Sequence, residues 1–145
     1  MLGYSEVKNA ASGSRGIKDT ALYFEMVTAE VGVDMPKGLY IPSSGKDLFE
    51  AIHHGAVASF WRKDEKIPAW LPNHFPLFMT DNIIEAVLGI LDHYYYNTKQ
   101  EEWGKMTIFI FRDEEMGKLQ TITNQNQYLK YRKSAEISLK LKGGE

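Results

Sequence analysis

The chain contains no cysteine, which excludes disulfide bonds and thiolate metal sites and is typical of a protein from a reducing compartment. It also lacks a strong charge of either sign, because a net charge of −2 gives no global field that would attract nucleic acid or an anionic membrane. Its longest apolar run, near residues 83–91, is interrupted by Glu85 and is too short to span a bilayer. The first residues lack the basic, apolar and small-residue succession of a signal peptide. We therefore expect a cytoplasmic protein with no membrane partner.

What remains is the composition of an ordinary globular protein. Of the 145 residues, 43% are hydrophobic and 25% are charged, which is enough to bury a substantial core in one domain, residues 1–145. Residues 1–20 are small and polar, and we expect them to form a weakly ordered lead-in. Residues 22–111 carry the periodic patterns of a core, and residues 112–145 are expected to form a C-terminal extension.

The core pattern alternates between strands and helices. Segments rich in β-branched and aromatic residues predict strands at 22–28, 38–41, 56–61, 76–80 and 106–111. One helix is predicted at 47–54, and a longer one follows Asp81, the predicted N-cap, with an apolar face from Ile84 to Tyr95. In the extension, 119–123 fits an edge strand and 125–133 a helix. This order predicts an α/β fold, with a mixed, largely parallel sheet of about five strands and flanking helices.

Several short segments occur in an order and spacing that resemble a known family. They are PKGLYI at 36–41, DLFEAI at 47–52, GAVA at 55–58, and PLFMTD at 76–81 followed by AVL at 86–88. Together they resemble the N-terminal domain of the Mur ligases, especially those that add the third and later peptide residues to the UDP-muramic acid precursor of bacterial peptidoglycan. The resemblance covers about half of the chain. It implies the fold of that domain, a bacterial and peptidoglycan-related role, and a ligand of the nucleotide-sugar type.

Two departures from the family limit what the resemblance implies about activity. Where the family has an Asp-Ser-Arg triplet that helps to hold uridine, this sequence has Glu30, Val31 and Gly32. Where the family has a Gly-x-x-Gly-Lys-Thr phosphate loop, the segment 112–118 carries three consecutive carboxylates, which would repel a triphosphate. We therefore expect a non-catalytic domain without a cofactor rather than an ATP-dependent enzyme.

The candidate ligand site is the turn that lies between a predicted strand and a predicted helix. It offers two hydroxyl groups, a glycine that lets the backbone approach a ligand, and a lysine, which suit a phosphate or carboxylate. We expect Ser43, Ser44, Gly45 and Lys46 to bind a small anionic ligand, such as a nucleotide-sugar or cell-wall precursor. The alternative for the same residues is an ordinary helix cap by Ser44 or Asp47.

Aromatic residues suggest an alternative function without a small-molecule ligand. Trp61, Trp70 and Phe75 flank the charged segment 62–66, and an exposed apolar patch there would predict a protein partner or self-association. Core packing and loop anchoring are the other interpretation.

The remaining polar patterns predict no further site. His53, His54, His74 and His93 do not have the spacing of metal ligands, and no base is identified for a serine nucleophile, so neither a metal nor a catalytic residue is predicted. The basic segment 130–142 lacks a nucleic-acid recognition motif and is expected to be a solvated face.

Overall fold

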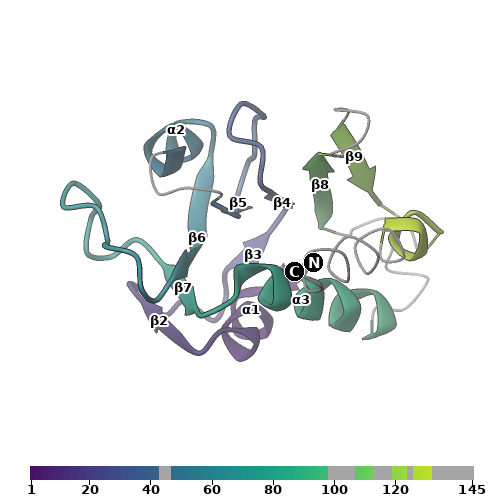
Figure 1. The fold of residues 1–145 in the computed structure, drawn as a ribbon, viewed down its shortest axis with the longest axis horizontal. Helices are drawn as coiled ribbons and strands as arrows, with labels where there is room; N and C mark the ends of the chain where they lie inside the picture. Colours follow the sequence, from purple (N-terminus) through teal and green to yellow (C-terminus); the bar gives the residue numbers. More distant parts are fainter. Residues whose placement is uncertain (43–46, 98–106, 113–118, 124–125, 132–145) are drawn as a thin grey trace, which may run out of the picture.

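The computed structural model describes residues 1–42, 47–97, 107–112, 119–123 and 126–131. Within them, a seven-stranded sheet has the order β2-β7-β6-β5-β4-β8-β9 (Figure 1). Its strands are β2 (Gly13–Arg15), β4 (Met26–Thr28), β5 (Gly38–Tyr40), β6 (Ala56–Arg62), β7 (Leu77–Thr80), β8 (Ile108–Arg112) and β9 (Leu119–Ile122). The five inner strands are parallel, and the edge strands β2 and β9 are antiparallel to their neighbours. The predicted α/β fold with a mixed, largely parallel sheet is confirmed, and it has two more strands than expected.

Helices cover both faces of this sheet. The helices are α1 (Tyr4–Ala10), α2 (Leu48–His53) and α3 (Ile83–Asn97), and residues 126–131 are also helical. Figure 1 shows α1 and α3 together on one side and α2 on the other. Because successive strand side chains point to opposite faces, β6 supplies Phe60 to a first core with α1 and α3, and Trp61 to a second core with α2.

The N-terminal segment belongs to the fold, so the expected lead-in over residues 1–20 is wrong for most of its length. A two-stranded sheet pairs β1 (Leu2–Gly3) with β3 (Tyr23–Phe24). Helix α1 buries Tyr4 and Val7 in the first core, and β2 pairs with β7 at the edge of the large sheet. The sequence does not reveal this because its buried side chains are few and small polar residues separate them.

Helix α3 starts one residue later than predicted. Asn82, rather than Asp81, is the N-cap, since its Oδ1 accepts a hydrogen bond from the N–H of Glu85 at 3.1 Å. Asp81 lies on the surface, with its carboxylate 3.9 Å from Nζ of Lys63. Ile84, which the pattern placed on the apolar face, is exposed.

The buried face of α3 carries Tyr94 and Tyr95. It consists of Ala86, Val87, Leu88, Ile90, Leu91, Tyr94 and Tyr95. The rings of Tyr94 and Tyr95 both lie near Phe109 of β8, at centroid distances of 5.7 and 6.2 Å. Both tyrosines therefore pack in the first core.

The segment predicted as one strand at 22–28 is divided at Glu25. The part before Glu25 pairs with β1, and the part after it is β4 of the large sheet. Glu25 keeps both backbone groups paired, because its N–H donates to the carbonyl of Lys37 at 3.2 Å and its carbonyl accepts from the N–H of Ile108 at 3.0 Å. The chain therefore changes sheets here without an unpaired backbone group.

The connection between the parallel strands β6 and β7, residues 63–76, contains no helix. Parallel neighbours need a crossover, and this one is irregular. Leu71 and Phe75 are buried in the second core. Indole Nε1 of Trp61 donates to the carbonyl of Glu65 at 3.0 Å, and a guanidinium N–H of Arg15 donates to the carbonyl of Pro72 at 3.3 Å. The connection is therefore fixed at several points.

Candidate functional site

The carboxyl edge is the edge of the large sheet at which the five parallel strands end. From β4 the chain proceeds through β5 and β6 to β7, and α3 then returns it to β8 on the other side of β4. The chain leaves β4 toward β5 and leaves β8 toward β9, which lie on opposite sides of this strand pair. The boundary between β4 and β8 is therefore a topological switch point. Ligands of open α/β sheets bind in crevices at such points.

The turn expected to bind the ligand follows β5, the neighbour of β4. Ser43, Ser44, Gly45 and Lys46 themselves lie outside the described residues. Their described neighbours, Pro42 and Asp47, join the end of β5 to the start of α2. The turn thus follows the carboxyl end of a central strand, one strand away from the switch point.

The described polar groups near this end of β4 and β5 serve the fold. Oγ1 of Thr28 accepts a hydrogen bond from the N–H of Glu30 at 3.0 Å, and the carbonyl of Thr28 accepts from the N–H of Ile41 at 2.9 Å. Buried Ser59 donates to the carbonyl of Tyr40 at 3.2 Å and of Phe60 at 2.8 Å. These groups satisfy one another, so none of them is aimed at a ligand.

The described charges near Tyr40 are negative. Burial, and after it the carboxylates of Asp47, Glu30 and Glu50, together raise the pKa of the Tyr40 hydroxyl to about 12. The same field opposes the binding of an anion. An anionic ligand at this edge therefore needs compensating positive charge, and Lys46 is the residue of the turn that carries it.

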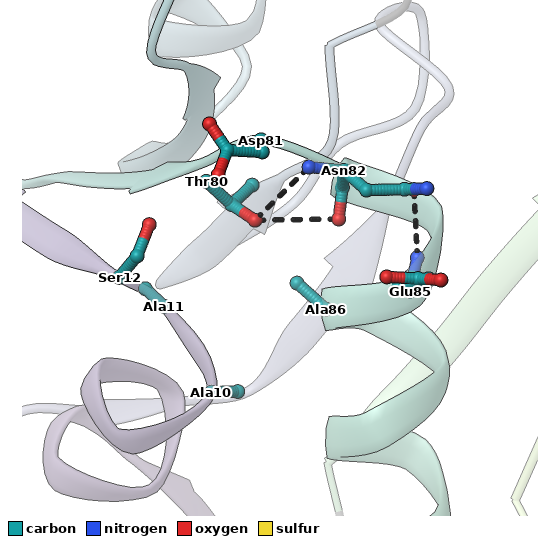
Figure 2. A pocket seen from close by; sticks show the side chains of 8 residues that line it. All are labelled: Ala10, Ala11, Ser12, Thr80, Asp81, Asn82, Glu85 and Ala86. Carbon is teal, nitrogen blue, oxygen red and sulfur yellow. Dashed lines mark hydrogen bonds between the residues drawn. The ribbon is translucent and has the colours of Figure 1, made fainter.

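A shallow hollow of about 320 Å³ lies between the α1–β2 connection and the β7–α3 turn (Figure 2). It is lined by Ala10, Ala11, Ser12, Thr80, Asp81, Asn82, Glu85 and Ala86. Oγ1 of Thr80 hydrogen-bonds to the backbone of Asn82 at 3.3 Å, and Ser12 donates to the carbonyl of Met79 at 3.1 Å. The sequence does not predict this hollow because three of its eight lining residues come from the segment expected to be a lead-in.

The expected aromatic interaction surface is wrong for two of its three residues. Trp61 is 1% exposed and Phe75 is 8% exposed, because strand β6 and the β6–β7 connection direct them into the second core. Trp70 is 48% exposed, and its ring lies 5.2 Å from that of Phe49, which is 55% exposed. Phe49 was not singled out from the sequence, although it lies off the buried face of α2.

The histidines occupy separate places. Nδ1 of His54 lies 3.1 Å from Oδ1 of Asp34, Nδ1 of His53 hydrogen-bonds to the carbonyl of Phe49, and Nε2 of His93 lies 3.9 Å from Oε2 of Glu6. Among the described residues, no three His, Asp or Glu side chains gather closely enough to hold a metal ion.

The aromatic residues near the start of the basic C-terminal segment 130–142 have packing roles. Tyr128 stacks on Tyr95 and Tyr131 stacks on Phe111, both at a centroid distance of 4.8 Å. The hydroxyl of Tyr128 also hydrogen-bonds to the carboxylate of Asp92. Residues 132–142 lie outside the described residues.

Comparison of the chain with protein-family models and with curated proteins finds no match. The resemblance to the Mur ligase N-terminal domain therefore stays a prediction. No helix in the described ranges is both long and apolar enough to cross a membrane.

Proposed function

We propose that the protein is a small-ligand-binding α/β domain without catalytic activity. Its ligand is an anion held at the carboxyl edge by the turn Ser43–Lys46. The observation that carries this proposal is the strand order, which puts the end of β5 beside β4 and close to the switch point. The turn adds hydroxyl groups, a glycine and a lysine, which suit a phosphate or carboxylate. Nucleotide-sugars and cell-wall precursors belong to this ligand class.

The negative charge at the carboxyl edge gives Lys46 a specific role in this proposal. The carboxylates of Glu30, Asp47 and Glu50 produce a negative potential near the end of β5, as their effect on the pKa of Tyr40 indicates. The ammonium group of Lys46 must offset this potential when an anion binds. Loss of Lys46 should therefore weaken binding, and loss of the negative charge of Glu50 should strengthen it.

A thermal-shift assay with phosphate, pyrophosphate, UMP, UDP and a UDP-sugar tests this proposal. A ligand that binds only the folded state raises the melting temperature. We expect a rise for at least one of these anions with the wild type, no rise with Lys46→Ala, and a larger rise with Glu50→Gln. Lys8→Ala, which removes a lysine from α1 on the other side of the sheet, is the matched control and should behave like the wild type.

Two outcomes contradict the proposal. The first is failure of the thermal-shift test, in which either no anion raises the melting temperature or the rise persists in Lys46→Ala. The second is turnover of ATP by the purified wild type, because a non-catalytic binding domain should release its ligand unchanged.

The burial of Trp61 and Phe75 removes most of the surface on which a protein partner was expected. Phe49 and Trp70 form a ring pair that is exposed.

A further inference from the structure

Two large aromatic rings are exposed side by side on the α2 face of the molecule. Phe49 comes from α2 and Trp70 from the β6–β7 connection, and their ring planes meet at 88° with centroids 5.2 Å apart. Large aromatic side chains on the surface forgo the stabilisation that burial would give them. Two perpendicular rings form a corner, in which a third ring can stack on one and meet the other with its edge.

The elements that carry these two rings are anchored in the second core. Leu48 and Ala51 anchor α2 in the second core and are fully buried. Leu71, the neighbour of Trp70, is buried in the same core, and its N–H donates to the carbonyl of Pro68 at 3.1 Å. Both rings are therefore carried by elements that packing fixes, so little ordering is needed when a ligand binds.

His53 lies beside Phe49, one of the two rings of the corner. Its ring lies 4.4 Å from that of Phe49, and its Nδ1 lies 3.0 Å from the Phe49 carbonyl oxygen. Because a carbonyl only accepts, Nδ1 carries the proton, and Nε2 of the neutral ring is the hydrogen-bond acceptor. Among the described residues, none makes a hydrogen bond to this Nε2.

The size of the corner indicates what kind of occupant fits. A fully exposed aromatic side chain presents about 150–250 Å². Since each ring is about half exposed, Phe49 and Trp70 together offer roughly 200 Å². A stable protein interface buries about 800 Å² on each partner. The corner therefore matches one small planar molecule rather than a protein or a second copy of this chain.

We propose that Phe49, His53 and Trp70 form a binding site for a planar heteroaromatic ring of the nucleobase class. The ring stacks on Trp70, and one of its N–H or amino groups donates a hydrogen bond to Nε2 of His53. This site does not depend on the anionic site at the carboxyl edge. It lies in the described part of the chain and recognises a ring rather than a phosphate.

Phosphate-free nucleosides test the site directly. Adenosine, guanosine, cytidine and uridine are titrated into the full-length protein at concentrations up to about 5 mM, and binding is followed by saturation-transfer NMR of the nucleoside signals. We expect saturable binding of at least one nucleoside, weakened about tenfold or more by Trp70→Leu, which removes the stacking surface. His53→Phe retains a ring against Phe49 but lacks the acceptor, and it should weaken binding by about three- to tenfold.

Tyr23→Leu removes an aromatic ring that is 53% exposed on β3, and it should leave nucleoside binding unchanged. Circular dichroism verifies that each variant is folded, which is expected because the substituted side chains are exposed. The proposal is overturned if no nucleoside binds saturably, or if Trp70→Leu binds as tightly as the wild type. If phosphate raises the melting temperature of Trp70→Leu as it does that of the wild type, the anionic site is independent of the aromatic site and is supported even where nucleoside binding fails.

Discussion

Replacing Thr107 by valine tests how the N-terminal segment is joined to the large sheet. Thr107 is fully buried just before β8. Its hydroxyl accepts a hydrogen bond from the N–H of Leu2 at 2.8 Å and donates one to the carbonyl of Phe24, so it connects β1 and β3. Its own N–H donates to the hydroxyl of Tyr94 at 2.8 Å, which ties the same point to α3.

The size of the effect follows from these contacts. Valine has nearly the shape of threonine, so packing is kept while the N–H of Leu2 and the carbonyl of Phe24 both lose a buried partner. A buried polar group left without its hydrogen bond costs about 1–3 kcal/mol. We therefore expect Thr107→Val to lower the free energy of unfolding by about 3 kcal/mol, a large part of the 5–15 kcal/mol that is typical of a domain.

Urea unfolding followed by circular dichroism measures this loss as a lower midpoint at unchanged slope. Thr107→Ser is the matched control, because it keeps the hydroxyl and loses only a methyl group, at a cost of about 1 kcal/mol. The reasoning is refuted if the valine variant is as stable as the serine variant or more stable than it.

Three further predictions test single features of the fold. Asn82→Ala should lower the free energy of unfolding, measured in urea, by about 1 kcal/mol, because the Asn82 side chain caps α3. Asp81→Ala should lower it by less than about 0.5 kcal/mol, and equal losses would contradict the cap assignment. Gly55→Ala should lower the free energy of unfolding by more than about 1 kcal/mol, because Gly55 has a φ of 115° and a Cβ there would lie 2.7 Å from the carbonyl oxygen of Met35. An unchanged stability would contradict this backbone conformation at the end of α2. Burial and neighbouring carboxylates raise the pKa of Tyr40 from 10.0 to about 12, so the unfolded state loses this proton first and stability should fall from pH 10 to 12. Tyr40→Phe should make this fall shallower, and an unchanged pH profile would contradict the assignment.

The parallel strands and the helices α2 and α3 could be predicted from the sequence because each carries its own local pattern. Strand β6 is apolar on both faces, and α3 repeats apolar residues at helical spacing, so neither needs information from the rest of the chain. The N-terminal segment could not be predicted in this way. Its strands are two and three residues long, and their pairing with β3 and β7 depends on contacts that are remote in sequence.

The candidate sites were predictable to different degrees. The position of the turn 43–46 after a strand follows from the local pattern, but the acidic surroundings of Tyr40 depend on how β4, β5 and α2 come together. Trp61 and Phe75 were grouped with Trp70 because they are near one another in the chain. Burial separates them from Trp70, since strand β6 is buried on both faces and hides Trp61, and the β6–β7 connection turns Phe75 into the second core.

The placement of the exposed aromatic corner follows from the unequal cover on the two faces of the sheet. The return from β7 to β8 passes through α3, a helix of 15 residues that, together with α1, covers the first core. The step from β5 to β6 passes through α2, which has only six residues, and the step from β6 to β7 contains no helix. The second face is therefore covered by a short helix and an irregular connection, whose inward side chains fill the core while Phe49 and Trp70 remain at the surface.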